Sequence, residues 1–119
     1  MKLSGIMLNS EDPKNLSNFY TKILGKPDWE MNEMYGYGKS GNNILIMGHS
    51  EVKGTNKDAA RIMLSFAVED TKAEFDKIKS AGAKVIAEPY QPDKNGNSKV
   101  WLATLADPDG NYIQLSTPW

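Results

Sequence analysis

Residues 10–27 read SEDPKNLSNFYTKILGKP, and this stretch has the start and stop signals of one amphipathic helix. Asp12 can accept hydrogen bonds from the free N–H groups of a first helical turn, Pro13 suits the first helical position, and Gly25 suits the left-handed stop. Between these signals, apolar side chains recur at the spacing of one helix face, namely Leu16, Phe19, Tyr20, Ile23 and Leu24. The stretch therefore predicts a helix between Asp12 and Gly25 that packs one side on a core.

Alternating or apolar segments on either side of this helix predict strands. In the first half of the chain we expect strands at 5–10, 28–34, 35–39 and 43–48. In the second half we expect strands at 62–68, 84–88, 99–105 and 111–117, with a polar loop at 91–98. A second helix is expected to start at Asp70 or Thr71 and to end at Gly82, with Glu74 placed to form a capping box with Thr71.

The two halves of the chain match one another. Leu8, Ser10 and Asp12 correspond to Phe66, Val68 and Asp70, each 58 residues later. Residues 40–48, SGNNILIMG, align with residues 109–117, DGNYIQLST, at an offset of 69. Because the elements follow in the same order twice, we infer a duplicated βαβββ unit. The fold class is then α+β, a single domain of two modules at about 1–55 and 60–119.

Composition excludes several classes of protein. A single His, His49, and the absence of Cys rule out disulfides, thiolate nucleophiles and any site that takes two imidazoles from one chain. With 14 basic and 15 acidic residues, the chain has no field that attracts nucleic acid or an anionic membrane. The sequence has no secretory or membrane-spanning pattern, so we expect a soluble, cytoplasmic protein.

The helix stretch 10–27, together with residues 99–118, KVWLATLADPDGNYIQLSTP, resembles the vicinal oxygen chelate superfamily. This superfamily includes glyoxalase I, bleomycin resistance proteins, fosfomycin resistance enzymes and extradiol dioxygenases, and the resemblance covers nearly the whole chain. It implies that the two modules curl into one cup-shaped mixed sheet with the helices outside, usually in a homodimer.

The resemblance also implies where metal-dependent members hold a divalent ion with His and Glu. Those four positions fall on Gly5, Leu45, Met63 and Gln114 of this chain. Gly has no side chain, Leu and Met are poor partners of a hard cation, and Gln offers one neutral carbonyl. We therefore expect no metal and no cofactor, and we expect His49 to be exposed or at the mouth of the cup.

Strand alternation predicts which side chains line the cup. The expected ligand-binding residues share a strand face without charged groups; they are Met7, Asn9, Leu45, Met47, Met63, Ser65, Leu102, Thr104 and Gln114. Such a lining suits a small neutral or aromatic molecule, unless these residues fill one another's space or pack across a dimer. Further candidates for ligand contact are the rings expected at edge, loop or terminal positions, namely Trp29, Tyr35, Tyr37, Tyr90 and Trp119.

Three functions remain open on the sequence. The first is a glyoxalase/bleomycin resistance-like protein that binds a small organic molecule without a metal. The second is a lactoylglutathione lyase-like enzyme, or another lyase, isomerase or dioxygenase, that uses an unrecognised metal or base. The third is a structural or interaction role for the dimer, and the sequence identifies no catalytic residue for any of them.

Overall fold

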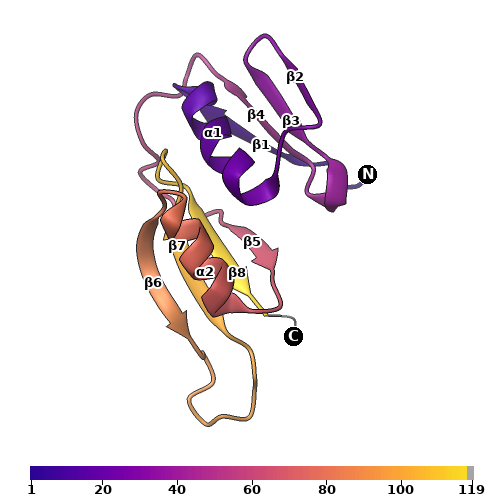
Figure 1. Ribbon diagram of the computed structural model, residues 1–119. Coiled ribbons are helices and arrows are strands. Elements are labelled where there is room, and N and C mark those ends of the chain that lie inside the picture. Colours follow the sequence, from indigo (N-terminus) through magenta and orange to yellow (C-terminus); the bar gives the residue numbers. More distant parts are fainter. Residues whose placement is uncertain (118–119) are drawn as a thin grey trace. The chain divides into compact units, whose positions relative to one another are not determined.

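The computed structural model describes residues 1–117, which form two compact units divided between Gly54 and Thr55. In each unit one helix packs on a four-stranded sheet (Figure 1). The first unit contains β1 (Ile6–Ser10), α1 (Pro13–Leu24), β2 (Trp29–Met31), β3 (Met34–Tyr37), the short 3-10 helix η1 (Lys39–Gly41) and β4 (Ile44–Gly48). The second contains β5 (Leu64–Ala67), α2 (Thr71–Ser80), β6 (Lys84–Tyr90), β7 (Leu102–Ala106) and β8 (Tyr112–Ser116).

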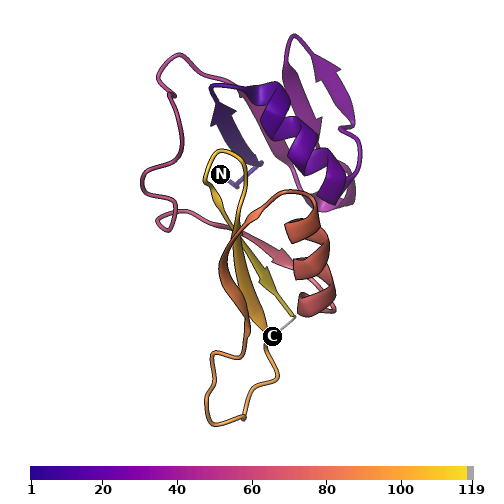
Figure 2. The same ribbon diagram turned by 60° about the vertical axis from the view of Figure 1, so that its left-hand side comes forward.

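The sheets of the two units have the same topology and the same register. Their strand orders are β1-β4-β3-β2 and β5-β8-β7-β6, and in each sheet the first pair is parallel and the others are antiparallel. Met7 lies opposite Leu45, and the residues 58 and 69 positions further on, Ser65 and Gln114, also lie opposite each other. The predicted α+β fold of two βαβββ modules is therefore confirmed. Figure 2 shows each helix on one side of its own sheet.

Both helices begin at an aspartate. The side chain of Asp12 accepts a hydrogen bond from the Asn15 amide at 3.1 Å, and that of Asp70 accepts one from the Ala73 amide at 3.1 Å. The predicted capping box on Thr71 is wrong, because the Thr71 hydroxyl instead donates to the backbone carbonyl of Trp101 at 3.2 Å. The sequence could not distinguish the two caps, since both residue types serve at helix starts.

The core of the first unit contains two tyrosines that the sequence placed at an edge. Tyr35 and Tyr37 lie opposite Ile46 and Ile44, on the sheet face covered by α1, and are 6% and 4% exposed. The Tyr37 hydroxyl lies 2.8 Å from Ser17 Oγ, donates to the Ser17 carbonyl and thereby ties α1 to β3. Because residues that lie opposite each other on paired strands point to the same face of a sheet, the two tyrosines share the helix-covered face with the buried isoleucines of β4.

The Asp107 side chain holds the closing turn of the second unit together. Asp107 is 4% exposed, and its Oδ1 accepts hydrogen bonds from the backbone amides of Asp109 and Asn111 at 2.9 and 3.0 Å. Its other oxygen accepts from the Asn111 side chain at 3.0 Å. The turn brings β7 and β8 together above a core whose buried members are Ala103, Leu105, Ile113 and Leu115.

Several predicted strand boundaries are wrong. The segment 28–34 is not one strand, because the chain turns at Asn32 and Glu33, whose φ angles are 51° and 60°. Two adjacent left-handed residues form the tight turn that matches the twist of a two-residue hairpin. The strand predicted at 35–39 ends at Tyr37, because η1 begins at Lys39. The strand predicted at 99–105 starts only at Leu102. No helix within residues 1–117 is both long and apolar enough to cross a membrane.

Candidate functional site

A row of four residues crosses the first sheet on the face opposite α1. Met7 on β1 lies opposite Leu45 on β4, Leu45 lies opposite Gly36 on β3, and Gly36 lies opposite Trp29 on β2. These positions alternate along their strands with the residues that α1 covers. We call Met7, Leu45, Gly36 and Trp29 the Trp29 row.

Gly36 allows the indole of Trp29 to lie flat on the sheet. A Cβ atom at Gly36 would lie 2.2 Å from Trp29 Nε1 and 2.3 Å from Cε2, so no other residue fits beneath the ring. Trp29 remains 46% exposed. One face of the indole therefore packs on the backbone while the rest of the ring is open for contact with another molecule.

A cavity of about 400 Å³ opens over this row. Its lining includes the side chains of Met7, Trp29, Leu45 and Asn43, and it contains no charged residue. Its volume falls within the range of sites that bind small organic molecules. The cavity is suited to a neutral and largely apolar ligand.

The structure divides the predicted lining residues between the two sheets. Met7 and Leu45 line the cavity itself, and Asn9 and Met47 form the next pair along the same two strands. In the second unit, Ser65, Gln114 and Thr104 form one row across β5, β8 and β7, Leu102 lies opposite Ser116, and Met63 directly precedes β5. That both groups line one site stays a prediction.

The side-chain oxygen of Asn9 is a buried polar atom without a hydrogen-bond partner in the described residues. A buried acceptor without a partner costs about 1–3 kcal/mol, so such atoms in native proteins call for an explanation. Asn9 does not line the cavity over the Trp29 row, so this oxygen is not within reach of a ligand there.

The four positions to which the resemblance assigns metal ligands do not fit a divalent ion. At Gly5 a Cβ atom would lie 2.6 Å from the Asn43 carbonyl oxygen, so the backbone leaves no room for a ligating side chain. Leu45, Met63 and Gln114 supply no imidazole or carboxylate. Among the residues that the structure describes, no three His, Cys, Asp or Glu side chains gather as a metal site would require.

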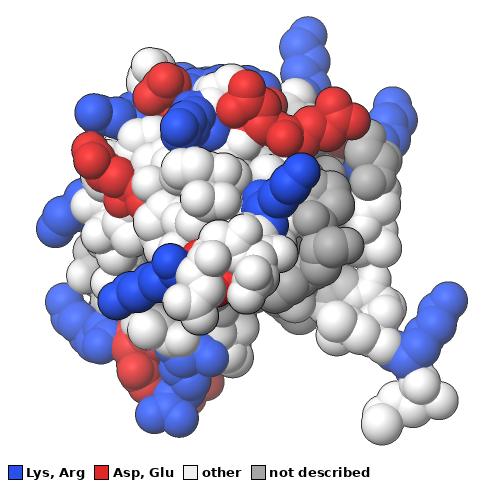
Figure 3. Space-filling view, turned by 90° about the horizontal axis from the view of Figure 1, so that it is seen from below, with Lys and Arg blue, Asp and Glu red and all other residues white. Residues whose placement is uncertain are grey.

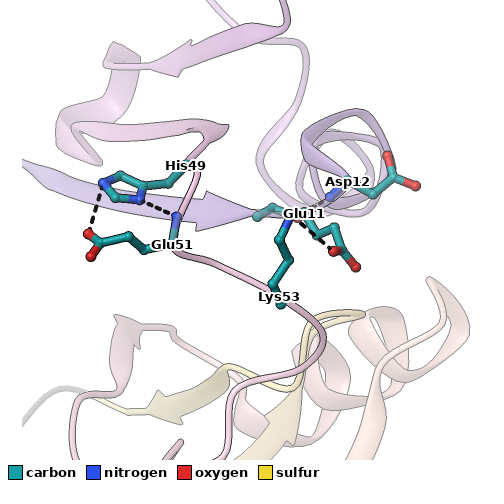
Figure 4. A network of polar contacts seen from close by, with 6 residues as sticks. Glu11, Asp12, His49, Glu51 and Lys53 are labelled. Carbon is teal, nitrogen blue, oxygen red and sulfur yellow. Dashed lines mark hydrogen bonds and ion pairs between the residues drawn. The ribbon is translucent and has the colours of Figure 1, made fainter.

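His49 lies outside the cavity, in an exposed polar network after β4 (Figure 4). Its Nδ1 accepts a hydrogen bond from the Glu51 amide at 3.1 Å, and its Nε2 is 4.0 Å from the Glu51 carboxylate. Lys53 in the same segment pairs with Glu11 at 3.8 Å. These contacts organise the chain that leaves the first sheet.

Sequence reasoning missed the role of Gly36. Trp29 was a candidate ring, but only the pairing of β2 with β3 places it over a glycine. The available signal was a single glycine within the strand sequence MYGY, because such a residue often marks a close approach of another group.

Tyr90 is 41% exposed and lies opposite Leu102, whereas Trp119 lies outside the described residues.

Comparison with known proteins agrees with this architecture. Residues 5–116 match the family described as the glyoxalase-like domain. A curated relative, the "Probable lactoylglutathione lyase" of Synechocystis sp., is 34% identical over 128 residues, which cover 97% of this chain and 94% of the relative.

Solved structures share the fold at lower identity. A glyoxalase/bleomycin resistance protein from Albidiferax ferrireducens superposes with a TM-score of 0.73 at 23% identity, covering 98% of each chain. The fosfomycin resistance protein FosX from Mesorhizobium loti superposes with a TM-score of 0.74 at 11% identity, covering 99% of this chain and 92% of FosX. Given the duplicated βαβββ units and the match over residues 5–116, the chain belongs to the glyoxalase-like family, within the vicinal oxygen chelate superfamily.

Proposed function

We propose that this protein binds a small, neutral, partly aromatic molecule over the Trp29 row and does so without a metal. The observation that carries this proposal is the open indole of Trp29 in an uncharged cavity of about 400 Å³. Stacking of an aromatic ligand on such a ring contributes about 0.5–1.5 kcal/mol beyond the burial of apolar surface.

The surroundings of the row support an adaptable apolar site. Met7 is 57% exposed, and Met47 follows one position along the same face from Leu45. Met31 and Met34 lie opposite each other at the end of the β2–β3 hairpin. Methionine side chains adjust readily to different ligand shapes.

Metal independence is part of the proposal because the chemistry of a lactoylglutathione lyase makes demands that this row does not meet. Isomerisation of a hemithioacetal needs a Lewis acid for the enediolate and a base for the proton. The lining of the cavity contains neither a carboxylate nor an imidazole. Lyase activity is the second candidate function, because the Synechocystis relative is named a probable lactoylglutathione lyase.

Binding of 1-naphthol, measured by calorimetry in buffer with EDTA, tests the proposal. Loss of ring stacking and burial in Trp29→Ala is expected to weaken binding about tenfold, which corresponds to about 1.4 kcal/mol. Tyr90→Ala removes a ring of similar exposure from the second unit and serves as the matched control. Absence of binding by 1-naphthol and by related ring alcohols, or a loss in Tyr90→Ala alone, would contradict the proposal.

The lyase candidate has its own test. Protein supplied with Zn²⁺ or Ni²⁺ is mixed with methylglyoxal and glutathione, and the thioester product is followed by its absorbance. The proposal predicts no turnover above the rate without protein. Metal-dependent turnover would establish the second candidate and refute the metal-independent site.

The homodimer expected from the resemblance belongs to the same proposal. Light scattering after size-exclusion chromatography is expected to give twice the mass of the chain. A single species with the mass of one chain would contradict it.

A further inference from the structure

A second cavity lies in the first unit, between α1 and the segment that leads into β2. Its volume is about 570 Å³, and its lining includes polar side chains of α1, among them Lys14, Asn18 and Thr21. These three residues recur at helical spacing along one stripe of α1. We call this cavity the α1 groove, and it differs from the cavity over the Trp29 row in having charged residues in its lining.

Tyr35 lines the α1 groove, and its hydroxyl has no hydrogen-bond partner within residues 1–117. Only 6% of the whole residue is exposed, but the hydroxyl oxygen itself is not fully buried, so a ligand in the groove can reach it. The neighbouring Tyr37 hydroxyl, in contrast, contacts Ser17 and Thr21. Burial, followed by the nearby carboxylates of Glu30 and Glu33, raises the pKa of Tyr35. The phenol is therefore a hydrogen-bond donor at neutral pH.

Charges of both signs surround this donor. Lys14 and Lys26 line the α1 groove together with Asp28 and Glu30, and Glu30 lies directly opposite Tyr35 on the paired strand. Lys14, Lys26 and Glu30 form no ion pair within the described residues. Asp28 uses Oδ2 to accept hydrogen bonds from the amides of Gly38 and Lys39 at 2.5 and 2.6 Å, which fixes the wall of the groove.

The balance of these charges selects the class of ligand. A simple anion is attracted by the two lysines and repelled by the two carboxylates, and a simple cation meets the reverse. A zwitterion can place its anionic group near the lysines and its cationic group near the carboxylates. Figure 3 shows that basic and acidic side chains are also interspersed on the face of the molecule that it draws.

We propose that the α1 groove binds a small zwitterion of the α-amino acid class. The ligand carboxylate accepts hydrogen bonds from the Tyr35 hydroxyl and the Lys14 ammonium group, and the ligand ammonium group donates to the Glu30 carboxylate. The α1 groove shares Trp29 with the cavity over the Trp29 row, but its other lining residues differ, and Tyr35 and Glu30 lie on the sheet face that α1 covers.

Free amino acids, tested one at a time against the full chain by NMR, probe this site. We expect at least one of the twenty to shift the amide signals of Asn18 and Thr21 in a saturable manner. Inorganic phosphate and methylamine, which each carry one sign of charge, are expected to bind at least tenfold more weakly. Equal binding of phosphate, or no shift with any amino acid, would overturn the proposal.

Two variants separate recognition from folding. Tyr35→Phe keeps the buried ring and removes only the hydroxyl, and it is expected to weaken binding about fivefold to tenfold. Glu30→Gln changes an exposed residue and is expected to do the same if Tyr35→Phe fails to fold. Tyr90→Phe, at an exposed tyrosine of the second unit, is the matched control and should leave affinity unchanged. Unaltered affinity in both Tyr35→Phe and Glu30→Gln would refute the site, whereas binding of 1-naphthol to the Trp29 row would remain intact.

Discussion

Substitution of Gly36 by Ala tests whether the Trp29 indole lies on the backbone as described. The added Cβ would lie 2.2 Å from Trp29 Nε1, a separation that non-bonded atoms do not adopt, so the ring must leave or the sheet must shift. Trp29 is 46% exposed, so roughly half of its surface, about 100 Å², is buried. At about 25 cal/mol per Å², release of the ring costs up to about 2.5 kcal/mol.

We therefore expect Gly36→Ala to lower the free energy of unfolding by about 1–2.5 kcal/mol. The same substitution in a Trp29→Ala background meets no ring, and alanine loses less backbone entropy than glycine on folding. There it is expected to be neutral or to stabilise by about 0.5 kcal/mol. Urea unfolding of the four proteins in this double-mutant cycle gives the coupling energy between the two positions.

Equal effects of Gly36→Ala in both backgrounds would refute the placement of the indole. The intrinsic fluorescence of the single variant provides a second readout, because displacement of Trp29 into water should shift its emission to longer wavelength. The 1-naphthol site should be lost together with the ring position.

Three further perturbations test other parts of the structure. Glu33→Gly should raise the free energy of unfolding by about 0.5–1 kcal/mol in urea titrations, because Glu33 has a φ angle of 60° that glycine adopts without strain; Glu33→Ala should bring no such gain. Asp107→Ala should lower it by about 2–3 kcal/mol in the same assay, since the Asp109 and Asn111 amides lose their buried acceptor; an effect below about 0.5 kcal/mol would contradict the role of this turn. The raised pKa of Tyr35 means that the folded state holds the phenol neutral, so stability present below about pH 10 is lost as the pH rises further. Urea unfolding between about pH 9 and 11 should therefore show a steeper decline for the wild type than for Tyr35→Phe, and parallel curves would contradict the assignment.

The repeated architecture could be predicted from the sequence because its signals are local. Asp12 and Asp70 cap helices at matching positions of the two halves, and the offsets of 58 and 69 residues found in the sequence reappear as the registers of the two sheets. The Asp107 turn was predictable for the same reason, since Asp before Pro and Gly forms hydrogen bonds within its own turn.

Features that depend on pairing between strands were missed. The hairpin turn at Asn32 and Glu33 contains no glycine; Asn32 is a residue type that tolerates the left-handed conformation, but Glu33 is not, so the sequence marks only one of the two left-handed residues. The sequence placed Tyr35 in an edge, loop or terminal position, whereas β3 is an inner strand of its sheet, with Glu30 of β2 on one side of Tyr35 and Ile46 of β4 on the other. Only the resulting register shows that Trp29 lies over Gly36 and that Glu30 lies opposite Tyr35.

The indole signals of the three tryptophans in a ¹H–¹⁵N NMR spectrum test the central claim most directly. The Trp29 signal is assigned by its absence from Trp29→Ala, and 1-naphthol is titrated into protein in the presence of EDTA. The account predicts a saturable shift of the Trp29 indole signal that is the same with and without the chelator. A Trp29 signal that stays in place, or that moves only after a divalent metal is added, would contradict a metal-independent site over the Trp29 row.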